Sequence, residues 1–170
     1  AQAYIGLGNA RFTNHVFPGE TLEVSIWKQK NNKLIISEPK NVIYYQRRAF
    51  CYFQNEKWEK AIADCDKGIL LDNSINNRNY LYNLKGNCYY YLRKWEKALE
   101  NYNYSLDYEY ENISVNKIKS EVLYNLDRYE ESIKICNFLL NFKSLVQPNK
   151  NEKFDIYILL AYNYIAIDSL

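Results

Sequence analysis

KWEKAI at residues 57–62 returns as KWEKAL at residues 94–99, and this repetition decides the fold. In both stretches an aromatic residue stands three positions before a small one, and a third, degenerate copy of the pattern follows. The three pairs are Trp58 and Ala61, Trp95 and Ala98, and Tyr129 and Ser132. Ala61 and Ala98 are 37 positions apart, and Ala98 and Ser132 are 34 apart. A period near 34 residues predicts helix pairs that must stack on their neighbours to bury their apolar faces.

Small and apolar residues recur at spacings of three and four around each motif, as amphipathic helices require. We expect these stripes to face neighbouring helices. In the first repeat they are Tyr45, Arg48, Ala49 and Tyr52, then Trp58, Ala61, Ile62, Cys65, Gly68 and Ile69. In the second they are Tyr82, Lys85, Gly86 and Tyr89, then Trp95, Ala98, Leu99, Tyr102, Ser105 and Leu106. In the third they are Ser120, Leu123, Tyr129, Ser132, Ile133, Cys136, Leu139 and Leu140. A further helix is predicted from Tyr157, Leu160, Ala161 and Tyr164.

Two stretches carry a resemblance to the tetratricopeptide repeat family: Ala49–Tyr52 followed by residues 57–62, and Gly86–Tyr89 followed by residues 94–99. The resemblance covers about residues 39–170, although Asn73 and Tyr110 stand where the family usually closes a repeat with proline. It implies a mainly α fold, an α-solenoid of about three and a half helix hairpins. The repeats are expected at about residues 42–75, 79–112 and 113–146, with a partial one at 154–170.

The same resemblance implies a partner-binding groove along the first helix of each repeat. The matching positions are Gln46, Phe50, Phe53, Asn83, Asn87, Tyr90, Lys117, Glu121, Tyr124 and Tyr162. Asn side chains can pair with the backbone of an extended peptide, and Tyr offers a large contact area at low entropy cost. The alternative is that several of the aromatic side chains pack against the next element instead of a partner.

One branch of the family grips the C-terminal carboxylate of cytosolic chaperones with a clamp of Lys, Asn and Arg. In this chain Asn87 matches one clamp position, but Asn83 stands where the paired Lys belongs and Arg47 replaces an Asn. An incomplete set of charges loses most of the bidentate recognition of a carboxylate. The departure therefore argues against a chaperone tail as the ligand.

The first 38 residues follow a different pattern and are expected to form a small antiparallel β segment. Residues 21–27 alternate apolar and polar side chains, residues 30–33 form a polar turn, and residues 34–36 read as the returning strand. Residues 11–13 are a candidate third strand. Residues 11–13, 16–22 and 27–28 resemble the closing strands of a MaoC-type hot-dog domain, the fold of type-2 enoyl-CoA hydratases. A less complete resemblance is to the last strand of an immunophilin domain. An artificial junction near Glu38 is a third reading.

Composition excludes several classes of function. A net charge of +2 argues against nucleic acid as the main partner, and no apolar run has the roughly 20 residues that a membrane span needs. The N-terminus lacks the zones of a signal peptide, and the absence of Met predicts a processed or excised chain. His15, the only histidine, has no catalytic partner in the pattern, and we expect no metal site or cofactor.

The charged and thiol side chains have structural explanations. Asp64, Asp66, Glu96 and Glu100 are expected to form solvated pairs with lysines of the same helices. The four cysteines have no zinc-ligand spacing and occupy matching repeat positions, so we expect buried, reduced thiols and an intracellular, cytoplasmic protein. Association with mitochondria or peroxisomes stays open.

The sequence as a whole predicts a non-catalytic scaffold that binds a partner protein, as an adaptor or as a subunit of a larger assembly. The alternative belongs to another class: a fragment of a hydratase or of an immunophilin co-chaperone whose catalytic part lies outside this chain.

Overall fold

The computed structural model describes residues 26–28, 34–36, 41–71, 74–107, 109–141 and 148–169. The chain divides into two units, Ala1–Lys40 and Asn41–Leu170. In the first unit β1 (Ile26–Lys28) pairs antiparallel with β2 (Leu34–Ile36), with Trp27 opposite Ile35. This matches the returning strand predicted at 34–36. The stretches 11–13 and 16–22, on which the hot-dog resemblance depends, lie outside the described residues.

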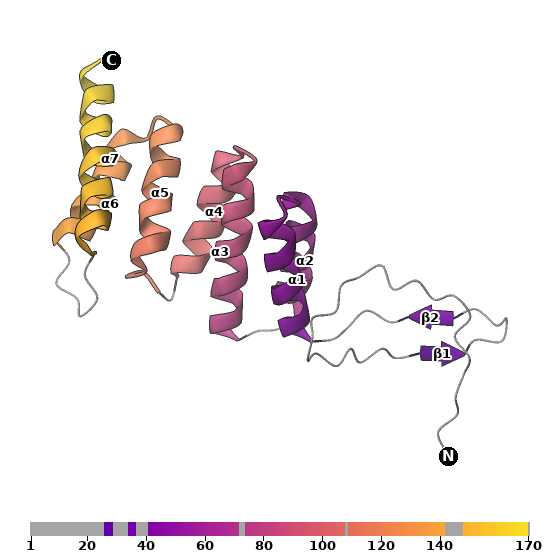
Figure 1. The fold of residues 1–170 in the computed structure, drawn as a ribbon. Coiled ribbons are helices and arrows are strands. Elements are labelled where there is room, and N and C mark those ends of the chain that lie inside the picture. The colour runs from indigo at the N-terminus through magenta and orange to yellow at the C-terminus, as the bar shows by residue number, and fades with distance from the viewer. Residues whose placement is uncertain are drawn as a thin grey trace. The chain divides into compact units, whose positions relative to one another are not determined.

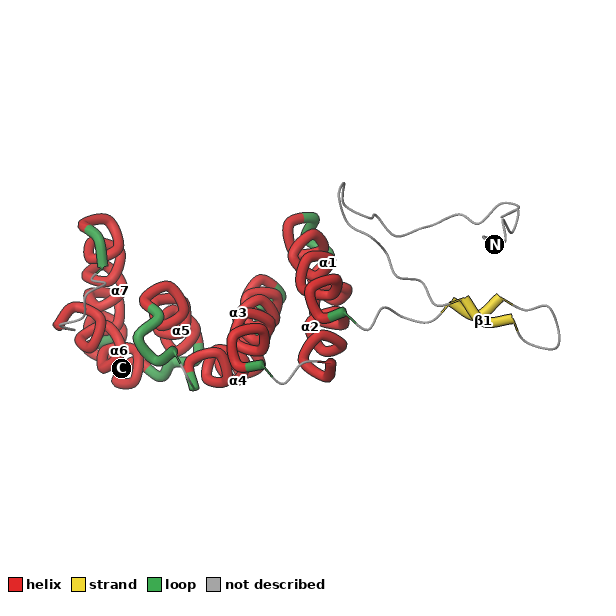
Figure 2. The backbone as a smooth tube through the Cα atoms, turned by 90° about the horizontal axis from the view of Figure 1, so that it is seen from below, coloured by secondary structure: helices red, strands yellow, loops and turns green. Residues whose placement is uncertain are grey.

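The second unit consists of helices alone in its described residues (Figure 1). They are α1 (Val42–Gln54), α2 (Trp58–Leu71), α3 (Ile75–Tyr91), α4 (Trp95–Leu106), α5 (Ile113–Asn125), α6 (Tyr129–Asn141) and α7 (Lys150–Asp168). Consecutive helices contact one another, and α1 also contacts α3 while α5 contacts α7. Figure 2 shows the odd-numbered helices along one side of this unit and the even-numbered helices along the other. The predicted α-solenoid of three helix hairpins and a further helix is confirmed.

The turn inside each hairpin has the same backbone geometry three times. The second of its three residues takes the left-handed conformation, with φ of 57° at Glu56, 54° at Arg93 and 56° at Asp127. In the first turn the amide of the next residue, Lys57, donates a hydrogen bond of 2.9 Å to the carbonyl of Tyr52, and the other two turns repeat it. This 6→1 bond satisfies carbonyls at the helix C-terminus. The spacing of the three left-handed residues reproduces the 37- and 34-residue periods of the sequence.

The small residues of the first three predicted stripes are buried at helix contacts. On α3 the prediction is right for Gly86 alone: the rest of its stripe is half-buried, and the other buried residues are Asn79, Leu81, Leu84 and Cys88. Ala61, Ala98 and Ser132 are all fully buried at the start of the second helices. On the facing helices the buried small residues are Ala49, Gly86 and Ser120. The Ser132 hydroxyl donates to the Ser120 carbonyl at 2.8 Å, so the third pair satisfies its extra polar atoms internally.

The phase predicted for the fourth stripe is wrong. Tyr157 and Tyr164 are 57% and 50% exposed, and Ala161 is also exposed. The buried residues of α7 are Ile156, Leu159 and Asn163 instead. Asn163 is fully buried, and its amide group donates to the Leu159 carbonyl at 2.7 Å, while its Oδ1 has no hydrogen-bond partner among the described residues.

Two acidic side chains pair with other helices rather than with lysines of their own helix. Asp64 is buried and receives two hydrogen bonds of 2.6 Å from the Arg48 guanidinium of α1. Asp66 pairs with Lys85 of α3 at 2.7 Å. The second contact joins the first hairpin to the second. The predicted solvated pairs at these two positions are therefore corrected.

The four cysteines are free thiols, three buried and Cys51 partly exposed, in agreement with their structural reading. Burial raises the pKa of Cys65 well above its ordinary range and that of Cys88 to about 12. These thiols stay protonated near neutral pH and behave as small apolar core residues.

Candidate functional site

The predicted groove residues all come from odd-numbered helices. We call the side of the array formed by α1, α3, α5 and α7 the A-helix face. Three of the ten residues lie on α1, three on α3, three on α5 and one on α7. Helix stacking therefore aligns positions that are about 34 residues apart in the chain, as a solenoid does.

Among the described residues, five contacts link successive helices of the A-helix face, and each involves at least one predicted groove residue. The ring contact of Phe53 with Tyr91 at 5.7 Å links α1 to α3. Gln46 donates from its side-chain amide to Asn77 Oδ1 at 3.0 Å, which links α1 to α3. The Tyr90 hydroxyl donates to Glu121 Oε2 at 3.0 Å, which links α3 to α5. Two contacts link α5 to α7. They are the ion pair of Lys117 with Asp155 at 2.6 Å and the ring contact of Tyr124 with Tyr162 at 6.4 Å.

The Tyr90 hydroxyl, which donates in the contact between α3 and α5, has a raised pKa. Burial is the main cause that raises the pKa of Tyr90 to about 12, and the negative charge of Glu121 adds to it. The hydroxyl therefore remains a hydrogen-bond donor at neutral pH. The contact orients Glu121, a carboxylate that the sequence had placed in the groove only by its repeat position.

The two predicted asparagines of α3 are already engaged or covered. Asn87 Oδ1 accepts a hydrogen bond of 2.8 Å from the Tyr102 hydroxyl of α4. Asn83 Oδ1 is buried and has no hydrogen-bond partner among the described residues. As the side chains stand, neither carbonyl oxygen is presented to a ligand, which leaves the amide groups as the available donors.

Three of the predicted aromatic residues pack inside the hairpins. Phe53 lies 5.1 Å from Trp58, Tyr90 lies 5.4 Å from Trp95, and Tyr124 lies 5.6 Å from Tyr129, measured between ring centroids. This repeated pair shows that the three aromatic residues of the sequence motif have equivalent surroundings. The exposed aromatic members of the predicted set are Phe50 and Tyr162, at 44% and 55%.

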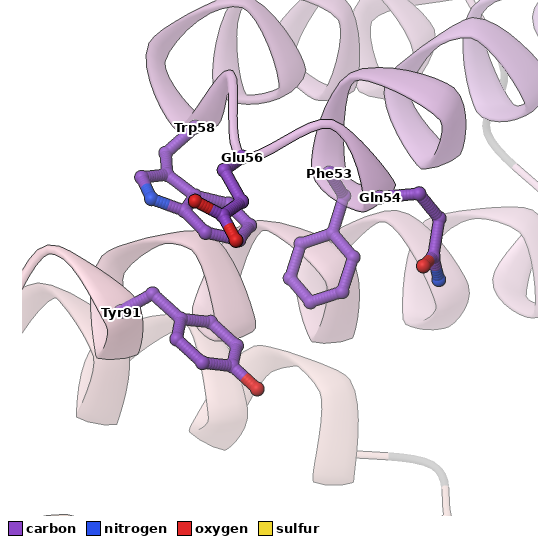
Figure 3. Close-up of a pocket in the computed structure, with 5 residues that line it drawn as sticks. All are labelled: Phe53, Gln54, Glu56, Trp58 and Tyr91. Atoms are coloured by element: carbon purple, nitrogen blue, oxygen red, sulfur yellow. The ribbon is translucent and has the colours of Figure 1, made fainter.

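A pocket of about 340 Å³ lies where the first hairpin meets the end of α3 (Figure 3). It is lined by Phe53, Gln54, Glu56, Trp58 and Tyr91. Only Phe53 belongs to the predicted groove. The sequence prediction missed the others because Gln54 is the last residue of α1, Glu56 lies in the turn and Tyr91 comes from the following repeat. The repeated aromatic motif pointed to Trp58, but as a packing residue.

The described residues contain no group of three or more His, Cys, Asp or Glu side chains placed to hold a metal ion. Among those same residues, no helix has the length and apolar character of a membrane span. The described groups of the A-helix face are aromatic rings, side-chain amides and the ion pair of Lys117 with Asp155.

Comparison with known proteins found no matching family model and no matching curated relative. Solved structures do match. The Hsp90 co-chaperone Cns1 of Saccharomyces cerevisiae aligns with a TM-score of 0.66 and 13% identity over 75% of this chain and 40% of that one. The chain thus spans less than half of the Cns1 chain.

Two further matching structures contain a bound peptide. The first tetratricopeptide domain of Spaghetti (RPAP3), bound to the HSP90 peptide SRMEEVD, aligns with a TM-score of 0.64 and 18% identity. The alignment covers 77% of this chain and 96% of that one. The Yersinia enterocolitica chaperone SycD, in complex with a peptide of the translocator YopD, aligns with a TM-score of 0.65 and 14% identity. That alignment covers 75% of this chain and 95% of the other. At such low sequence identities the similarity shows the fold alone. The helices of this chain form a tetratricopeptide-like array.

Proposed function

We propose that this protein is a non-catalytic scaffold that binds an extended segment of a partner protein along its A-helix face. The observation that carries the proposal is the series of contacts between successive odd-numbered helices. They hold Glu121, Lys117 and the rings of Tyr90 and Tyr124 at fixed places along one side of the array. Exposed Phe50 and Tyr162 flank this row on α1 and α7. Aromatic anchors among polar groups are typical of protein-binding surfaces.

The structural neighbours support this proposal because two of them hold a bound peptide. We do not extend the HSP90 peptide itself to this chain. Asn83, with its buried carbonyl oxygen, stands where the chaperone-tail clamp has a lysine, and a neutral amide offers no charge to a terminal carboxylate. The free thiols fit a reducing compartment, and we propose an intracellular protein. No observation favours the hydratase or immunophilin alternative.

A peptide-display experiment tests the proposed face. A library of random peptides is selected on the purified chain, and the affinity of the synthesised ligands is measured by fluorescence anisotropy. We expect the double substitution Phe50→Ala with Tyr162→Ala to raise Kd about 10-fold or more, since truncating an interface aromatic costs about 1–2 kcal/mol.

Two exposed residues elsewhere provide matched controls. Tyr110 lies between α4 and α5 and is 61% exposed, and Leu70 lies on α2 and is 85% exposed. Tyr110→Ala and Leu70→Ala should leave Kd unchanged. If the selected peptides lose affinity with either control but tolerate the double substitution, the binding surface is not the A-helix face and the proposal is wrong.

A further inference from the structure

The pocket between the first hairpin and α3 contains three aromatic rings in mutual contact. Trp58 and Tyr91 are stacked, with centroids 4.9 Å apart and planes within 7° of parallel. Phe53 meets both rings edge-on, at 5.1 Å from Trp58 and 5.7 Å from Tyr91. Tyr91 remains 58% exposed even though the indole covers one of its faces. The pocket therefore offers preformed aromatic surface to a ligand.

The pocket also contains one charged side chain, the exposed carboxylate of Glu56. Among the described residues this carboxylate takes part in no ion pair or side-chain hydrogen bond, whereas Asp64 and Asp66 are both paired. Figure 3 shows Glu56 beside Trp58 and the amide of Gln54 on the far side of Phe53. The lining carries acceptors and ring faces, and no basic residue contributes to it.

Cations of the array stack on other rings. Arg48 lies over the ring of Tyr44, Lys60 over Tyr52 and Lys97 over Tyr89, with the cation 4.8–5.8 Å from each ring centroid. In the described part of the chain no cation lies over Phe53, Trp58 or Tyr91. The three rings beside the free acid therefore keep their exposed faces clear of any cation of the described residues.

The equivalent places in the other hairpins differ in ways that remove this combination. The turn residue that corresponds to Glu56 is Arg93 in the second hairpin, which reverses the charge. In the third hairpin it is Asp127, whose carboxylate accepts a hydrogen bond of 2.6 Å from the Tyr129 hydroxyl. The position of Tyr91 on α3 is taken on α5 by Asn125, which has no ring. Among the three turns, the free acid beside stacked rings is specific to the first.

We propose that this pocket binds an arginine side chain of the partner, and the inference thereby deepens the proposed function by naming one residue of the bound segment. The planar guanidinium stacks on the open aromatic surface. Its N–H groups donate to the Glu56 carboxylate. Arginine fits better than lysine because its planar, weakly hydrated fork both stacks on rings and pairs with a carboxylate through two bonds.

The test uses a probe that needs no partner protein. The peptide acetyl-Gly-Arg-Gly-amide is titrated into the ¹⁵N-labelled full chain while the indole N–H signal of Trp58 is followed by NMR. We expect a saturable shift at Trp58 and not at Trp95. The citrulline peptide, a neutral isostere, should produce at most a tenth of that affinity, and the lysine peptide should bind several-fold more weakly. Glu56→Gln should weaken arginine binding about 10-fold.

Arg93→Gln is the matched control because it makes the same kind of substitution at the same left-handed turn position of the next hairpin. It should leave the affinity of the probe unchanged. Equal binding of the citrulline peptide, an unchanged affinity in Glu56→Gln, or lysine binding as tight as arginine would each overturn the assignment.

The two proposals can fail separately. If the arginine peptide does not shift the Trp58 signal, but the Phe50 and Tyr162 substitutions still raise the Kd of the displayed peptides, only the arginine pocket is rejected. A genuine arginine site combined with displayed peptides that ignore the A-helix face rejects only the proposed function.

Discussion

Replacing Gly86 with alanine tests how rigidly the array is packed between α3 and α4. A Cβ atom at this position would lie 2.7 Å from Cε1 and 2.8 Å from Cδ1 of Tyr102. Ordinary van der Waals contact begins at 3.4 Å, so the ring or the helix must move. Tyr102 is fully buried, and its hydroxyl is held by Asn87 Oδ1 at 2.8 Å. The ring therefore has little freedom to withdraw.

The expected magnitude is the balance of opposing effects. Overpacking a well-packed core costs about 1–3 kcal/mol, and weakening the buried hydrogen bond of Tyr102 adds about 1 kcal/mol. The higher helix propensity of alanine returns about 1 kcal/mol. We expect Gly86→Ala to lower the free energy of unfolding by about 1–3 kcal/mol, measured by urea denaturation followed by circular dichroism at 222 nm.

Gly68→Ala is the control, because the atom nearest to its new Cβ is Cδ1 of Leu81, the far end of a flexible side chain, at 2.8 Å. Gly68→Ala should lower the free energy of unfolding distinctly less than Gly86→Ala does. In addition, Tyr102→Leu should reduce the cost of Gly86→Ala in a double-mutant cycle, since a smaller side chain leaves room for the methyl group. A Gly86→Ala variant that is as stable as the wild type, with no coupling to Tyr102, would refute the reasoning.

Four further predictions concern charge, backbone and thiols. Arg48→Ala should lower the free energy of unfolding by about 3 kcal/mol, because it leaves the buried carboxylate of Asp64 without its counter-charge. Lys85→Ala should lower it by under about 1 kcal/mol in the same urea assay, because its partner Asp66 is half exposed. Arg93→Gly should raise the urea midpoint by relieving the left-handed conformation, a gain of about 1 kcal/mol; a lower midpoint would contradict this. A thiol reagent at pH 8 should label Cys51 first and Cys88 only on unfolding, which mass spectrometry of the labelled chain checks. Because folding raises the pKa of the Cys88 thiol from 9.0 to about 12, its contribution to stability is complete below pH 9 and is lost as the pH rises toward 12, and the urea midpoint should fall across that window.

The repeat architecture could be predicted because small residues leave a periodic signal. Small residues are buried at equivalent positions of three hairpins, namely Ala49, Gly86 and Ser120, and this recurrence can be read from the sequence. On α7 the signal fails. Almost every residue from Ile156 to Ile167 is apolar, so several stripes satisfy the helical period. The buried stripe includes Asn163, which a search for apolar or small residues passes over.

The candidate site was predictable only in part, for a related reason. Repeat position places Tyr90 and Glu121 on one face, but the hydrogen bond between them depends on the spacing of α3 and α5. The partner of Asp64 is likewise a residue on another helix, 16 positions earlier, rather than a neighbour one turn away. The pocket draws its rings from two repeats, and a pattern read one repeat at a time cannot bring them together.

The side-chain contacts across the A-helix face give the array a mechanical property. Tyr90 with Glu121 and Lys117 with Asp155 act as ties between hairpins, and they involve the same groups that a bound segment would use. A ligand that binds Glu121 must break its hydrogen bond with Tyr90. The free energy of binding is then reduced by the free energy of the lost contact between α3 and α5. A segment that binds more tightly to these groups would therefore make the array more flexible between the hairpins that the contacts join.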